Sequence, residues 1–297
     1  MPLATRPAPP LAPIGAAIVP SAPASFAPGG GDIIDRAQAN SPPPPAFGAA
    51  STVPWTGVYG GVNIGYGTTR GGGEESCINT QTNTNSGCQS IPSSALSSSG
   101  FIGGGQVGYM QPLDLNLGGL NLGAWPLVVG VEADLQGADL SATQNVAGPF
   151  QTVNFPLDPC NNCSYTAHQS VNWLGTIRAR AGVPVDQFLI YGTAGMAVGS
   201  ATGSQTEFFG STPGYVASVT TTLTGPTVGG GVELMLPGDL PLSAKLEGLY
   251  YDLGDVQTKA LPQTNVATNF NNLKTFGFHG AILRLGINFH FGALGGY

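Results

Sequence analysis

The amino-acid sequence predicts an all-β protein, namely an eight-stranded antiparallel up-and-down β-barrel that spans a membrane. Only 8% of its 297 residues are charged, against roughly 25% in soluble domains, and few charges suit a wall that faces lipid. No apolar run approaches the ~18 residues of a transmembrane helix, whereas side chains alternate with a period of two from Trp55 onward. A closed barrel is the other structure that satisfies its backbone groups in a bilayer.

Residues 1–54 differ in composition from the rest of the chain. They contain more than half of the 25 prolines and show no hydrophobic period, which predicts a disordered, polyproline-type segment. An exported protein is expected to carry a signal peptide. Arg6 and the apolar stretch 11–19 match one poorly, because Pro13 interrupts the stretch. We therefore expect an atypical signal peptide, an omitted one or a misplaced start, followed by a barrel over residues 55–297.

Eight segments carry the period-two alternation, and single-chain bacterial barrels have an even number of strands. The segments cover residues 56–66, 101–111, 127–136, 173–183, 188–198, 227–236, 242–251 and 276–291. Long polar connections (67–100, 137–172, 199–226 and 252–275) alternate with shorter ones (112–126, 184–187 and 237–241). This pattern predicts long loops outside the cell and turns in the periplasm, where both termini are then expected.

Charged residues lie on one face of the predicted strands, because successive side chains point to opposite faces. Val129, Val131 and Leu135 thus oppose Glu132 and Asp134. An unpaired charge in a closed interior is costly, and eight strands enclose only enough space for side chains. We predict that the apolar faces meet lipid and that the charged faces form an interior ion-pair network without an open channel. Its members are four acids and four bases: Glu132, Asp134, Arg178, Arg180, Glu233, Lys245, Glu247 and Arg284.

Aromatic residues near the segment ends predict the girdles that transmembrane barrels place at both membrane interfaces. The alternative is that these rings form the core of a soluble barrel. The predicted girdle residues are Trp55, Tyr59, Phe188, Phe289 and Phe291 at the periplasmic interface, and Tyr250 and Tyr251 at the other.

A series of Gly-rich and aromatic motifs follows a specific order along the chain. It opens with Trp55-Thr56-Gly57-Val58-Tyr59 and continues through residues 60–67, 100–109, 129–134, 173–180, 189–195, 245–254 and 284–291. In sequence and spacing these motifs resemble the porin-family outer-membrane β-barrel proteins of alphaproteobacteria, which are eight-stranded, OmpA-like barrels.

The resemblance implies a place in the bacterial outer membrane, contact with outer-membrane lipid and lipopolysaccharide, and insertion by the barrel-assembly machinery. It implies an envelope role that is structural, surface-interacting or, for some members, passively diffusive, and it implies no reaction. Family members usually end on a final Phe that the assembly machinery reads. Residues 292–297 follow Phe291 in this chain, so this signal is expected either at Tyr297 or inside the chain.

Four cysteines, Cys77, Cys88, Cys160 and Cys163, fall in the predicted loops. An even number in an exported chain predicts disulfides. Three pairings are open, of which Cys77 with Cys88 and Cys160 with Cys163 are the local ones. The alternative for the Cys160-x-x-Cys163 spacing is half of a zinc site or a redox pair, which an oxidising compartment disfavours.

His168 and Ser170 lie two positions apart, so a strand would place both side chains on one face, where His could activate Ser as a nucleophile. Outer-membrane lipid A deacylases are similar in carrying a His-x-Ser pair on an eight-stranded barrel. Continuing the alternation from Arg178 and Arg180 places this pair inside the barrel, and no acid at matching spacing orients the His. A lipid hydrolase is therefore the least favoured function.

The predicted function is a structural or surface-interaction barrel with a filled interior, and the alternative is a small passive diffusion channel. We expect no enzyme activity, metal or cofactor. We also expect no nucleic-acid partner, because the net charge is −7 and no Lys/Arg cluster exists. The loops are expected to be a solvated surface that a ligand can contact. Their charged residues are Glu74, Glu75, Asp139, Asp158, Glu207, Asp252 and Asp255, with Arg70, Lys259 and Lys274.

Overall fold

The computed structural model describes residues 55–73, 75–79, 83, 95–113, 116–117, 120–121, 127–152, 155–263 and 270–291. The chain divides into two units, Met1–Ala49 and Ala50–Tyr297, and the described residues all belong to the second. The Pro-rich segment 1–54, for which an atypical signal peptide was one expectation, and residues 292–297 lie outside the described residues. Within the described ranges, no helix is long and apolar enough to cross a membrane.

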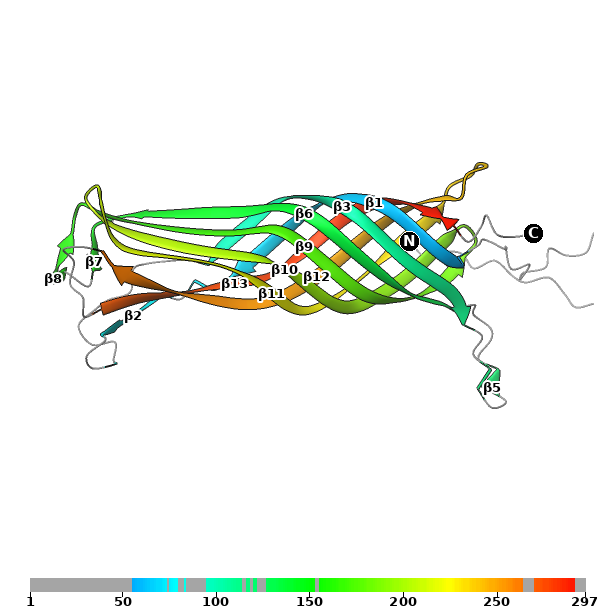
Figure 1. The fold of residues 1–297 in the computed structure, drawn as a ribbon, viewed down its shortest axis with the longest axis horizontal. Helices are drawn as coiled ribbons and strands as arrows, with labels where there is room; N and C mark the ends of the chain where they lie inside the picture. Colours follow the sequence, from blue (N-terminus) through cyan, green and yellow to red (C-terminus); the bar gives the residue numbers. More distant parts are fainter. Residues whose placement is uncertain are drawn as a thin grey trace, which may run out of the picture. The chain divides into compact units, whose positions relative to one another are not determined.

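Eight long strands form a closed antiparallel ring in the order β1-β3-β6-β9-β10-β11-β12-β13, which the pairing of β1 with β13 completes (Figure 1). This confirms the predicted eight-stranded barrel. Their bounds are β1 (Gly57–Gly71), β3 (Leu96–Leu113), β6 (Leu127–Ala147), β9 (Cys163–Val185), β10 (Phe188–Phe209), β11 (Thr212–Met235), β12 (Leu242–Pro262) and β13 (Phe270–His290). Among the shorter strands, β2 (Glu75–Asn79) pairs with β13, β4 (Asn116–Leu117) with β5 (Leu120–Asn121), and β7 (Phe150–Thr152) with β8 (Phe155–Cys160).

Most ring strands are far longer than predicted, because much of the polar sequence assigned to loops is strand. The six strands β6 and β9 to β13 have 21 to 24 residues, whereas roughly 9–11 span a membrane. Only Gly210 and Ser211 connect β10 to β11. Ser, Thr and Asn continue these strands because every second residue packs inward, for example Tyr165 and Ala167 in β9.

The part of the barrel nearest to Gly57 and His290 has an apolar outer wall, which we call the lipid band. It comprises residues 58–66 of β1, 101–113 of β3, 127–137 of β6, 174–185 of β9, 188–197 of β10, 226–235 of β11, 242–251 of β12 and 281–290 of β13. Its large outward side chains are strongly exposed, including Val62 (65%), Phe101 (71%) and Ile177 (63%). In a bilayer these side chains meet lipid tails.

Beyond the lipid band the strands continue as the distal extension, which we define as residues 138–147, 163–173, 198–209, 212–225, 252–262 and 270–280. Its interior is an apolar core in which Leu140, Val171, Phe276 and Phe278 are fully buried. Its outer face carries mainly Ser, Thr and Asn. The distal extension is therefore packed like a soluble β-protein, with apolar side chains inside.

β9 reverses its faces where the two parts meet. In the lipid band its large buried side chains have even numbers, from Leu174 to Arg180, whereas in the distal extension they have odd numbers, from Tyr165 to Val171. The register with both neighbours shifts at this level. β12 makes the same reversal at Gly254, whose φ of 89° disfavours a side chain, and the backbone N–H of Gly254 donates to Asp252 Oδ1 at 2.9 Å. Such bulges exchange the two faces of a strand.

The predicted aromatic girdle is only partly present. Phe188, Tyr250 and Phe291 are exposed as a girdle requires. Trp55, Tyr59 and Tyr251 are buried, so the prediction was wrong for these three residues. Position near a strand end suggested a girdle, but the alternation places Tyr59 and Tyr251 on the interior face of their strands. Trp55 packs edge-on against His290, with ring centroids 5.7 Å apart.

Candidate functional site: an interior charge network

The structure brings all eight predicted charged residues together inside the lipid band. β6 supplies Glu132 and Asp134, and β9 supplies Arg178 and Arg180, in each case two residues apart and so on one face. β11, β12 and β13 supply the rest. Every one of these side chains is at most 2% exposed, and ion pairs connect all of them; the remaining members are Glu233, Lys245, Glu247 and Arg284.

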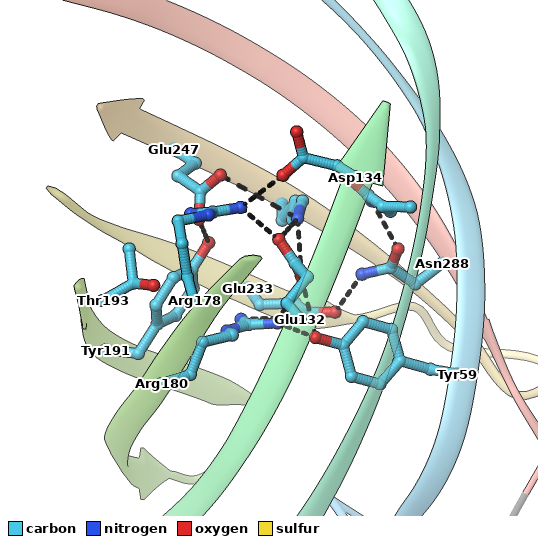
Figure 2. A network of polar contacts seen from close by, with 12 residues as sticks. Tyr59, Glu132, Asp134, Arg178, Arg180, Tyr191, Thr193, Glu233, Glu247 and Asn288 are labelled. Carbon is cyan, nitrogen blue, oxygen red and sulfur yellow. Dashed lines mark hydrogen bonds and ion pairs between the residues drawn. The ribbon is translucent and has the colours of Figure 1, made fainter. Parts of the chain in front are cut away.

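Glu132 lies at the centre of the network (Figure 2). Its Oε1 accepts hydrogen bonds from Arg178 Nη2 at 2.6 Å and from Lys245 Nζ at 2.9 Å. Its Oε2 accepts from Arg180 Nη1 at 2.9 Å and from the Tyr59 hydroxyl at 2.7 Å. One carboxylate thus joins cations from β9 and β12 across the interior, and such charge-assisted hydrogen bonds are among the stronger ones.

Asp134 and Glu247 complete one side of the network. Arg178 Nη1 donates to Glu247 Oε1 at 2.9 Å, and Arg178 Nη2 donates to Asp134 Oδ2 at 2.8 Å. Arg284 bridges the same two acids, with Nη2 2.6 Å from Glu247 Oε2 and 3.0 Å from Asp134 Oδ2. Both arginines therefore contact more than one carboxylate, which fixes β9 and β13 relative to β6 and β12.

Glu233 forms the end of the network nearer to His290. It accepts from Arg180 Nη2 at 2.8 Å and from Asn288 Nδ2 at 2.6 Å. His290 Nε2 lies 3.6 Å from the same carboxylate and 2.9 Å from the Ser243 hydroxyl. Neutral side chains thus complete the hydrogen bonding of the charges.

Tyr59 and Tyr191 belong to the network, although the sequence analysis did not include them. The guanidinium carbon of Arg180 lies 3.8 Å from the ring centroid of Tyr191, whose hydroxyl donates to Glu247 Oε1 at 3.0 Å. Gly108 leaves room for Tyr59, since a Cβ there would lie 2.3 Å from the Tyr59 ring. The alternation of side chains along β1 and β10 could have identified both tyrosines, because it places them on the interior faces of these strands.

The network has equal numbers of acids and bases and is almost wholly shielded from solvent. Low dielectric makes each ion pair strong but also makes any unpaired charge costly. Among the described residues, no group of three or more His, Cys, Asp or Glu could hold a metal ion. The arrangement therefore suits a structural plug that fills the interior, and it presents no nucleophile to a substrate.

His168 and Ser170 do not lie inside the barrel, so that prediction was wrong. The reversal in β9 places His168 on the outer face of the distal extension, opposite the buried Ala167 and Gln169, and alternation places Ser170 on the same face, where it is only 9% exposed. His168 Nδ1 lies 3.0 Å from the hydroxyl of Thr143 on β6. This partner is a neutral hydroxyl rather than the acid that a catalytic histidine needs.

Two predicted loop charges, Glu207 and Lys274, are buried in the distal extension rather than solvated. Asn272 Nδ2 donates to Glu207 Oε2 at 2.8 Å, and burial raises the pKa of Glu207 to about 7. Lys274 Nζ lies 5.5 Å from the Tyr165 ring centroid and 5.7 Å from that of Phe276. Both residues were assigned to the surface because their segments were taken as loops.

Cys163 begins β9, and it is buried and disulfide-bonded. The side chains of Cys77, Cys88 and Cys160 lie outside the described residues. The pairing therefore stays a prediction.

Comparisons with known proteins agree with this architecture. The model of the outer membrane protein beta-barrel domain family matches residues 45–291. The 31 kDa outer-membrane immunogenic protein of Brucella melitensis is 27% identical over 253 residues, which cover 85% of this chain and 90% of that protein. The protein from Brucella suis matches equally.

Two solved structures are also similar. The outer membrane protein OprG from Pseudomonas aeruginosa has a TM-score of 0.42 and 13% identity, with 79% of this chain and 97% of that chain covered. A major outer membrane protein from Thermus thermophilus has a TM-score of 0.33 and 14% identity, with 77% and 99% covered. With a family model matched over the whole ring of strands, this chain belongs to the outer membrane protein β-barrel domain family and is a protein of the bacterial outer membrane.

Proposed function

We propose that the protein is a structural, surface-interacting outer-membrane barrel whose interior is closed to solutes. The observation that carries this proposal is the burial of the charge network, whose side chains are at most 2% exposed. Charges that line a water-filled pore would instead contact solvent. The network joins β6, β9, β11, β12 and β13 and so occupies the space that a pore would need.

The test is the conductance of the purified full-length protein in a planar lipid bilayer. We expect no steady single-channel current. Val131→Ala is a matched control on the lipid-facing side of the same strand, and it should behave like the wild type. A steady wild-type current that changes with Arg178→Ala but not with Val131→Ala would refute the closed interior and establish the alternative, a small passive diffusion channel.

The surface-interacting part of the proposal rests on the distal extension. Its strands continue far beyond the length that a membrane requires, and their outer face is polar and nearly uncharged, with exposed residues such as Thr143, Thr220 and Gln257. We propose that lipid and lipopolysaccharide surround the lipid band, that the barrel-assembly machinery inserts the chain, and that both termini lie in the periplasm with the distal extension outside the cell.

We further propose that the protein is not an enzyme. His168 faces outward on the polar extension, where its ring nitrogen lies near Thr143 and not near a carboxylate. If the protein nevertheless hydrolysed lipid A, Ser170→Ala would abolish that activity, whereas Ser204→Ala on the neighbouring strand would leave it unchanged. Such a pair of results would overturn this part of the proposal.

A further inference from the structure

The pairing of β11 with β12 is interrupted within the distal extension. The two strands pair at Tyr215–Pro262 and Val216–Leu261, and then again from Thr227–Tyr251 onward. Between these points, residues 217–226 and 252–260 form no ladder with each other, although all of them are described. Figure 1 shows β11 lying with β9 and β10, and β12 lying with β13, along this stretch. We call this interruption the seam.

The seam leaves backbone hydrogen-bonding groups without a strand partner. Along a strand, alternate residues direct their N–H and C=O groups to opposite neighbours. β11 is paired with β10 along this stretch, so its other edge is open from residue 217 to residue 224; at Gly225 the backbone of Asp252 already lies against it. At about 3.3 Å per residue, the open edge is about 25 Å long.

The two edges of the seam differ in how they are protected. Natural edge strands avoid unwanted pairing through charges, prolines or bulges. The β12 edge has two of these protections: the charges of Asp252, Asp255 and Lys259, and the bulge at Gly254. Residues 217–225 of β11 contain no charge and no proline, and five of the nine are Val or Thr. The β11 edge is therefore the one that is open to a further strand.

The side chains along the seam would suit a strand with one apolar and one polar face. On the inner side, Val219 and Leu223 of β11 are only half-buried against the apolar core. On the outer side, Thr220, Thr222 and Thr224 are exposed. A strand added to this edge would cover the half-buried residues with one set of alternate side chains and expose the other set to water.

We propose that the seam is a docking site for an extended peptide segment of a partner protein, which pairs with the edge of β11 by β-strand addition. The segment has no proline and carries apolar side chains at every second position. A second copy of this chain fits poorly as the partner. Two barrels in one membrane point the same way, so their β11 strands would pair in parallel. A twofold axis along the strands would place each N–H opposite the same N–H of the other copy, whereas a parallel ladder needs each N–H to face a C=O.

This inference deepens the proposed function, because it names the class of partner and rests on the distal extension lying outside the cell. The conductance experiment tests the closed interior of the lipid band, and peptide binding tests the seam. A conducting barrel that binds peptide would refute only the closed interior, and a closed barrel that does not bind would refute only the seam.

The probe is a synthetic peptide of sequence Lys-(Thr-Val)4-Lys with a fluorescent label, added to the refolded full-length protein in detergent. We expect saturable binding by fluorescence anisotropy and slower hydrogen exchange in residues 217–224. The matched control peptide has the same side chains but carries N-methyl groups on alternate residues, which removes the donors of one edge. It should bind at least tenfold more weakly.

A cross-link across the seam provides the matched protein variants. Thr220→Cys with Gln257→Cys places two exposed side chains on opposite sides of the seam, and joining the two thiols with a reducible bis-maleimide linker should lower peptide affinity at least tenfold, which reduction of the linker restores. Thr143→Cys with His168→Cys carries the same linker between two residues of the outer face that are already paired across β6 and β9, and should leave affinity unchanged. Equal binding of both peptides, undiminished binding to the cross-linked seam variant, no binding at millimolar peptide, or pairing of two copies through β11 would overturn the proposal.

Discussion

The lipid band and the distal extension are built from the same strands, yet they bury opposite kinds of side chain. In the lipid band, charges such as Glu132 and Arg178 lie inside and Ile177 faces outward; in the distal extension, Phe276 lies inside and Thr143 faces outward. Alternation along a strand fixes only that its two faces differ. The surroundings, lipid or water, decide which face turns outward, and the bulges in β9 and β12 exchange the faces at the boundary.

The largest expected effect is the loss of the carboxylate at the centre of the lipid band. Glu132→Ala leaves Arg178, Arg180 and Lys245 without their shared partner. Breaking a buried ion network at one partner costs about 3–5 kcal/mol. Denaturant unfolding of the refolded barrel in detergent measures this loss, with Val131→Ala as the control on the outer face. An equal change in the free energy of unfolding for both variants would mean that the interior charges do not stabilise the lipid band.

Truncation of a phenylalanine is expected to cost much more inside the distal extension than on the outer face of the lipid band. Phe276→Ala removes a fully buried ring from the core of the distal extension, which should lower the free energy of unfolding by about 3–4 kcal/mol. Phe101→Ala removes a lipid-facing ring that is 71% exposed, and should change it by less than about 1 kcal/mol. Similar losses in both variants would contradict the packing assigned to the extension.

A charge added to the outer face should distinguish the two parts along one strand. Ile177→Arg places a cation on the lipid face of β9 and should cost about 2–4 kcal/mol. His168→Arg, on the outer face of the same strand in the distal extension, should stay within about 0.5 kcal/mol. Unfolding in lipid vesicles gives both values. A costly change at His168 would place the membrane further along the barrel than the lipid band does.

Glu207 gives the predicted pH dependence of the distal extension. Its Oε1 has no hydrogen-bond partner among the described residues, and burial raises its pKa from 4.5 to about 7. The folded state therefore holds the proton more tightly than the unfolded state. The contribution of Glu207 to stability should be greatest below about pH 4.5, fall as the pH rises to about 7, and then level off, with a total loss of about 3 kcal/mol.

Glu207→Gln should remove this dependence and stabilise the distal extension at pH 8 while changing little at pH 4.5. Local opening free energies of the β10–β11 hairpin from hydrogen exchange provide the measurement. Two other groups adjoin this region, Tyr215, which pairs with Glu207 in register, and Lys274 on β13; neither is altered in the variant. A wild-type profile that persists in Glu207→Gln would assign the titration to another group.

The sequence was sufficient for the features that depend on alternation within the lipid band. The eight strands were predictable because Val129, Val131 and their equivalents alternate strictly with polar residues. The charge network was predictable because Glu132 and Asp134, or Arg178 and Arg180, lie two residues apart, and because a closed interior requires balanced charge. Tyr59 was missed because its position near a strand end suggested a girdle, although the alternation along β1 places its side chain on the interior face.

The distal extension could not be predicted for two physical reasons. Its outward residues are Ser, Thr and Asn, which are also typical of loops, so strands β6 and β10 were ended too early and Glu207 was assigned to solvent. The reversal in β9 leaves almost no mark in composition, because its apolar residues from Tyr165 to Ile177 have odd numbers with the exception of Leu174. Continuing one face through this bulge turned His168 and Ser170 to the wrong side.

Spin-label accessibility along β9 tests this reversal most directly. Single cysteines at residues 164–183 of the refolded protein in lipid vesicles carry the label, in a background where the native cysteines are replaced. Oxygen should reach the odd positions around Ile177 and Ala179 best, whereas a water-soluble nickel complex should reach the even positions around Thr166 and His168 best. If the odd positions, or the even positions, were the accessible ones along the whole of β9, with no exchange between the two ends, the account would be contradicted.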